Sequence, residues 1–84
     1  ALEQNYPNPF NPSTIIKFAL PSDSKVSLRV YNVLGEVVSE LLNDKLAAGY
    51  HEVKFDATGF SSGIYFYRIE AGNFVEVRKM NLMK

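Results

Sequence analysis

The residues Gly-Ile-Tyr-Phe-Tyr-Arg-Ile-Glu-Ala at positions 63–71 decide the fold. In an extended chain, Ile64 and Phe66 share one face, and the opposite face carries Tyr65, Tyr67 and Ile69. A short run that is apolar on both faces is typical of a central strand covered on both sides. We therefore expect residues 63–71 to hold a sheet together from its middle.

A second strand is predicted after the turn formers at 72–73, and it runs almost to the last residue. Its apolar side chains change phase partway along, from Val75 and Val77 to Met80 and Leu82. A β-bulge would reconcile the two halves, because it lets two residues oppose one. We expect that irregularity at residues 78–79. A strand in this position offers the end of the chain for recognition.

Earlier in the chain, β-branched and aromatic residues alternate with polar ones. The inward set is predicted to be Ile16, Phe18 and Leu20 in residues 14–20, Val26, Leu28 and Val30 in residues 25–31, and Val53 and Phe55 in residues 50–56. Turn formers separate these runs, at 21–24, 32–35, 43–44, 48–49 and 58–63. The spacing predicts a small all-β sandwich.

Residues 36–49 are ambiguous, because their apolar residues fall at helical spacings and Gly49 would serve as a helix stop. A strand over 36–42 is the preferred interpretation. The turn at Asn32 to Gly35 joins it to residues 25–31 as a hairpin, and an isolated helix of this length is marginal in water.

The first thirteen residues contain three Xaa-Pro bonds, at Pro7, Pro9 and Pro12, which bias the preceding residues toward extended backbone. A bare linker gains nothing from exposed aromatic rings, so we expect Tyr6 and Phe10 to lie against the domain. Residues 1–13 are therefore predicted to be an ordered Pro-rich strap, continuous with a sandwich at residues 14–84.

Composition narrows the classes of function. A chain of 84 residues fits one domain and can spare few apolar residues for a deep pocket. Nine basic and nine acidic side chains cancel, which argues against a nucleic-acid or anionic-membrane binder. Without cysteine there are neither disulfides nor thiolate metal sites. No apolar run is long enough to span a bilayer, and residues 1–7 do not read as a signal peptide.

No catalytic constellation is evident. His51 is the single histidine, and nothing places a serine beside it on a strand-to-helix elbow. The acidic residues are spread singly, which gives neither a metal spacing nor a pair for glycoside hydrolysis. We expect no cofactor, no metal and no enzymatic activity. The aromatic residues are interpreted as core filling rather than as a carbohydrate platform.

Five ordered blocks carry a resemblance to a known family: Asn-Tyr-Pro-Asn-Pro-Phe-Asn-Pro-Ser-Thr at 5–14, Val-Tyr-Asn-Val-Leu-Gly-Glu-Val-Val at 30–38, Ala-Gly-Tyr-His at 48–51, Ser-Gly-Ile-Tyr-Phe-Tyr-Arg-Ile at 62–69, and Arg-Lys-Met-Asn-Leu-Met-Lys at 78–84. Together they resemble the type A C-terminal sorting domain of the type IX, or Por, secretion system. The wider immunoglobulin-like group, including a domain of flagellar hook-capping proteins, shares the style of the fourth block.

The resemblance implies an immunoglobulin-like antiparallel β-sandwich of about seven short strands, placed at the end of a larger exported protein. It implies a non-catalytic address that the secretion machinery recognises, so that an N-terminal cargo passes from the periplasm through the outer membrane. A sortase-like surface protease then removes the domain, and any cleavage site is expected upstream of Ala1. The cargo becomes secreted or attached to the cell surface.

The resemblance also implies which residues matter. The sorting signal maps onto Gly72, Arg78, Lys79, Met80, Leu82 and Lys84, and the family motif maps onto Pro7, Pro9, Phe10, Asn11, Pro12, Gly63 and Tyr65. Strand addition at the edge of the final strand is one hypothesis for how the signal is read. The alternative interpretation is an accessory immunoglobulin-like spacer or carbohydrate-binding module of a secreted hydrolase.

Overall fold

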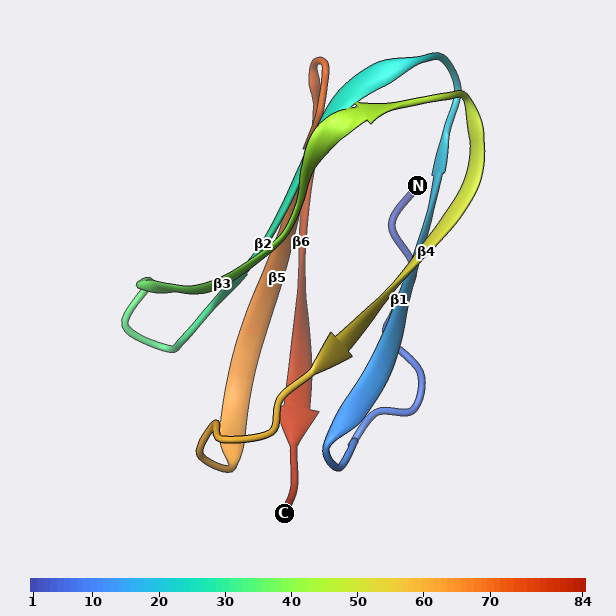
Figure 1. The fold of residues 1–84 in the computed structure, drawn as a ribbon. Coiled ribbons are helices and arrows are strands. Elements are labelled where there is room, and N and C mark those ends of the chain that lie inside the picture. Colours follow the sequence, from blue (N-terminus) through green and yellow to red (C-terminus); the bar gives the residue numbers. More distant parts are fainter.

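The computed structural model describes all of residues 1–84, and the chain folds as two antiparallel sheets that face each other (Figure 1). One sheet pairs β1 with β4, and the other has the order β3-β2-β5-β6. The strands are β1 (Ser13–Leu20), β2 (Ser24–Tyr31), β3 (Val37–Leu46), β4 (Gly49–Asp56), β5 (Gly63–Ala71) and β6 (Phe74–Leu82). The predicted all-β sandwich is confirmed, with six strands where about seven were expected.

Alternation of apolar and polar residues places the core as the sequence predicts. Ile16, Phe18 and Leu20 of β1 are buried, and so are the predicted inward residues of β2, Val26, Leu28 and Val30. In β4, Phe55 is buried and Val53 packs against the core at partial exposure. The two sheets therefore meet through side chains of one alternation phase, which is how a sandwich excludes water.

The ambiguous segment forms a strand and not a helix. Strand β3 pairs with β2 as a hairpin through the turn at Asn32 to Gly35, as predicted. The turn expected at 43–44 is wrong, because Asn43 and Asp44 continue β3 opposite Ser27 and Val26. Their polar side chains are tolerated because β3 is an edge strand exposed to solvent. The chain turns after Leu46 and crosses to the other sheet as β4 (Figure 1).

Strand β5 lies between β2 and β6, so its predicted central position is confirmed. Its predicted coverage on both faces is wrong. Tyr65, Tyr67 and Ile69 face the core, but Ile64 and Phe66 are only half-buried on the outer side of the sheet. No further layer of structure covers that side of the sheet (Figure 1).

The bulge predicted at 78–79 is also wrong, because β6 pairs with β5 in one continuous register from Gly63↔Leu82 to Ala71↔Phe74. In this register Glu76 and Arg78 point inward, on the same side as Met80. They meet the backbone of the Pro-rich strap there. Arg78 Nε donates to the Leu2 carbonyl at 2.8 Å, and Glu76 Oε1 accepts from the Leu2 amide at 3.4 Å. Charged residues at inward positions therefore have partners, and no phase change is needed.

The Pro-rich strap runs antiparallel to β1, through the bridges Leu2↔Phe18 and Tyr6↔Ile15. Its three Xaa-Pro bonds are cis. Phe10 is 2% exposed, as expected, but the prediction for Tyr6 is wrong, because its side chain is 80% exposed. Tyr6 pairs directly with Ile15, whose side chain is on the outer face of β1, so Tyr6 must also point outward. The preceding residue, Asn5, points inward instead and is buried.

We predict that the strap contributes to stability through Phe10. Replacing Phe10 with Ala should lower the free energy of unfolding by about 3–5 kcal/mol, because a buried aromatic side chain is lost and a cavity remains. Urea denaturation measures the change. Tyr6→Ala is the matched control on the same segment and should shift stability by no more than about 0.5 kcal/mol. Equal effects of the two substitutions would show that the strap is not packed into the domain.

Candidate functional site

The residues predicted for the sorting signal do not form one surface. Met80 and Leu82 are fully buried in the core. Gly72 lies in the turn between β5 and β6, at the opposite end of β6 from Lys84, and has a φ of 60° that favours glycine. Lys79 and Lys84 are exposed. The structure therefore divides the predicted set into core residues, a turn residue and accessible cations.

Arg78 belongs to none of these groups. Its half-buried side chain reaches the Leu2 carbonyl and forms an ion pair with Glu76, at 3.2 Å between Nη2 and Oε2. The guanidinium of Arg78 is therefore occupied by two groups of the domain itself, the Leu2 carbonyl and the Glu76 carboxylate. Arg78 thus connects the terminal strand to the strap.

The front block of the family motif and the terminal strand do come together. The Phe10 amide donates to the Asn81 carbonyl at 3.0 Å, and the Met83 amide donates to the Phe10 carbonyl at 3.0 Å. The Asn81 amide donates to Asn8 Oδ1 at 2.9 Å, and Gln4 Nε2 donates to the Lys79 carbonyl at 2.7 Å. Two segments from opposite ends of the sequence therefore form one hydrogen-bonded unit.

These contacts decide which part of the β6 edge is open. Along β6, alternate residues direct their backbone groups away from β5, and Asn81 is one of them. The strap occupies this edge from Lys79 to Met83. A further strand could add there only after the strap is displaced. At Val75 and Val77 no hydrogen bond from the strap reaches the backbone edge.

Phe10 also anchors a row of aromatic rings across the core. Its centroid lies 6.0 Å from that of Phe55, which lies 5.7 Å from Phe60, and Phe60 lies 5.9 Å from Tyr65. These tilted arrangements are favourable for aromatic pairs. Tyr65 Oη donates to the Ser61 carbonyl at 2.7 Å. Phe10 and Tyr65, both predicted motif residues, thus contribute to packing.

A buried polar network, which the alternation of residues in the sequence does not predict, fixes the strap. The Asn5 amide donates to Tyr67 Oη at 2.8 Å, and Tyr67 Oη donates to the Glu3 carbonyl at 2.7 Å. Asn5 Nδ2 donates to Thr14 Oγ1 at 3.0 Å, and Thr14 Oγ1 donates to the Pro7 carbonyl at 2.8 Å. Burial raises the pKa of Tyr67 to about 12. The sequence predicts that Tyr67 points inward on a central strand, where its hydroxyl needs a polar partner. That requirement is the sign of the network that the sequence offers.

The structure gives the candidate catalytic groups structural contacts. His51 Nε2 lies 2.7 Å from the Ala47 carbonyl and so donates to it, and the imidazole stacks on Phe18 at 5.4 Å. Asp56 Oδ1 accepts from the amide and hydroxyl of Thr58, and these bonds lower the pKa of Asp56. No hydrogen bond joins His51 to a serine or a carboxylate, and no group of three metal-ligating side chains converges. No helix could serve as a membrane span.

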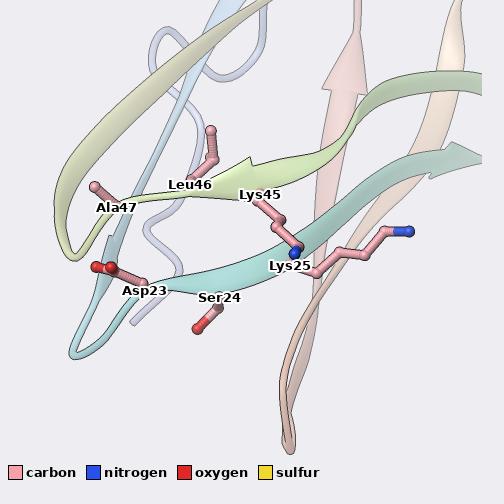
Figure 2. A pocket seen from close by; sticks show the side chains of 6 residues that line it. All are labelled: Asp23, Ser24, Lys25, Lys45, Leu46 and Ala47. Atoms are coloured by element: carbon pink, nitrogen blue, oxygen red, sulfur yellow. The ribbon is translucent and has the colours of Figure 1, made fainter.

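Several hollows lie on the surface of the domain. The largest, about 440 Å³, lies where β3 ends beside the start of β2 (Figure 2). Its Asp23 carboxylate accepts from the Ala48 amide at 2.9 Å and thereby holds the crossing between β3 and β4. Lys25 and Lys45 pair across the two strands, and Figure 2 shows them side by side. The Ser24 hydroxyl of this hollow donates to the Ser22 carbonyl at 3.0 Å and not to a base, so it is not arranged as a nucleophile.

Comparison with known proteins bears on the whole chain. Residues 4–82 match the family described as the secretion system C-terminal sorting domain. The match includes the strap from Gln4 onward and the terminal strand to Leu82. No curated protein matches the chain at the significance required.

We predict that Tyr67→Phe lowers the free energy of unfolding by about 1–3 kcal/mol at neutral pH, because the Asn5 amide loses its buried acceptor. Burial raises the pKa of Tyr67 from the usual 10.0 to about 12, so between these values the unfolded state loses its proton first. The stability that Tyr67 contributes is complete below pH 10 and is lost as pH approaches 12.

Urea denaturation from neutral to alkaline pH measures this difference. The difference in free energy of unfolding between the parent and Tyr67→Phe should shrink as pH rises from 10 to about 12. Tyr50→Phe is the control, because Tyr50 is 88% exposed and should show no gap at any pH. A gap for Tyr67→Phe that stays constant with pH would contradict the assignment.

Proposed function

Because the chain belongs to the family of C-terminal sorting domains of the type IX secretion system, we propose that it carries an attached N-terminal cargo through the outer membrane. The family match over residues 4–82 is the observation that carries this proposal. Sorting for type IX secretion places the protein among secreted or cell-surface proteins, and we propose that it travels by way of the periplasm.

The fold supports an address rather than a reaction. The family is one of sorting signals, and the candidate catalytic groups of this chain take part in structural contacts, His51 with Ala47 and Asp56 with Thr58. The domain also needs no help from a neighbouring domain to bury its core residues. Such a module can stay folded beside unrelated cargo.

We propose that the machinery reads the domain in its folded state. Met80 and Leu82 contribute by holding β6 in the core, whereas Lys79 and Lys84 are accessible to a partner. Pro7, Pro9, Asn11 and Pro12 contribute by shaping the strap that positions Phe10 against Asn81. After translocation, a sortase-like surface protease removes the domain and releases or attaches the cargo.

The experiment fuses residues 1–84 behind a signal peptide and a fluorescent protein, in a host that has the type IX apparatus. We expect fluorescence on the cell surface or in the medium, because the fusion contains residues 4–82, which match the sorting-domain family. Fractionation of cells, membranes and medium measures the distribution. The same fusion in a strain that lacks the apparatus is the control, and there it should stay in the periplasm.

A fusion that is folded but stays in the periplasm of the competent host would contradict the proposed function. A fusion that reaches the surface equally in both strains would contradict the role of the type IX apparatus.

A further inference from the structure

We propose that the outer face of the β3-β2-β5-β6 sheet, around Val77, is the surface by which a protein component of the secretion machinery reads the terminal strand. This inference rests on the proposed sorting function and deepens it. It names the accessible side of the strand and the chemistry of the partner. Tyr31, Val33, Phe66, Arg68, Val77 and Lys79 define this surface, which we call the outer patch.

The outer patch is on the accessible side of β6. Strand β6 has one side in the core, where Met80 and Leu82 are fully buried, and one backbone edge closed by the strap from Lys79 to Met83. The remaining side points outward, since Val75 and Val77 are 49% and 51% exposed. A partner that recognises the folded terminal strand through its side chains meets this outward side.

The side chains of the outer patch have the chemistry of a protein-binding surface. Val77 pairs with Arg68 of β5, and Phe66 pairs with Tyr31 of β2, so apolar and aromatic groups from three adjacent strands share one face. They line a hollow of about 290 Å³ together with Val33, which is 68% exposed. Aromatic and arginine side chains in an exposed apolar patch are typical of the centre of a protein interface.

The charge of this outer face selects the partner. Strand register puts five cationic side chains on this outer face against two carboxylates, Glu40 and Glu70, and the five are Lys25, Arg29, Lys45, Arg68 and Lys79. The carboxylates form ion pairs with Arg29 at 3.2 Å and Arg68 at 3.0 Å. Lys79 has no ion pair, so an acidic partner surface complements it.

The same charges argue against a second copy of this chain. A twofold dimer through the outer patch would bring one cationic face against another. The outer side of the other sheet carries no such excess of cations, because Lys17 and Lys54 lie there with Glu3, Glu52 and Asp56. The partner is therefore a protein surface that is apolar at its centre and acidic beside Lys79.

The test uses the fluorescent fusion with Val77→Asp and Lys79→Glu as separate variants. Each should lower the amount of fusion reaching the surface or medium by at least about tenfold, the loss expected when a central interface contact is replaced by repulsion. The matched control is Tyr50→Asp, which places the same new charge on an exposed strand residue of the other sheet. It should be exported like the parent.

Thermal denaturation of each purified domain accompanies the export assay. Lys79 is exposed, so Lys79→Glu should melt like the parent, and a loss of its export would support recognition rather than folding. If Val77→Asp melts at a lower temperature than the parent, Val77→Thr is tested in its place, because threonine keeps the strand propensity of the residue.

Three results would overturn the proposal. Export of folded Val77→Asp and Lys79→Glu at the parent level would show that the outer patch is not read, while the sorting function would stand. Binding of the purified domain to phosphatidylglycerol vesicles that is abolished by Lys79→Glu would assign the patch to lipid. A dimer in sedimentation that Val77→Asp dissociates would assign it to a second copy. Failure of the parent fusion to leave the periplasm would instead contradict the sorting function itself.

Discussion

The hydrogen bonds between Phe10 and the terminal strand are the contacts on which the rest of the structure depends. They join a strap at the start of the chain to residues Asn81 and Met83 at its end. Phe10 is buried by this pairing and begins the row of aromatic rings through Phe55 and Phe60. Without the strap, β6 would have an open edge and the core would lose two apolar residues, Leu2 and Phe10.

The pairing with the strap leaves the terminal strand in three different environments. Its inward side holds the core through Met80 and Leu82, its free edge is paired with the strap from Lys79 to Met83, and its outward side carries Val75, Val77 and Lys79. Residues 74–82 form a structural strand, and the proposed recognition of the folded domain therefore uses its exposed side chains.

The alternation of apolar and polar residues along the sequence predicted which side chains of a strand face the core. The alternation in Thr14–Leu20 placed Ile16 and Phe18 in the core because one face of β1 packs on the other sheet. The pattern failed at Glu76 and Arg78, whose inward positions face strap backbone and not apolar side chains. The network of Asn5, Thr14 and Tyr67 was missed because its partners lie up to 62 residues apart. For the candidate site, the sequence named Phe10 and Lys79 but could not tell packing residues from accessible ones.

Amide hydrogen exchange followed by NMR tests the central claim most directly. The Asn81 and Met83 amides donate to the strap, whereas the Val77 amide points to the open part of the edge. Pairing of the strap with β6 predicts that the Asn81 and Met83 amides exchange about 100-fold or more slowly than the Val77 amide, because they exchange only when the strap opens. Exchange of Asn81 and Met83 as fast as that of Val77 would contradict it.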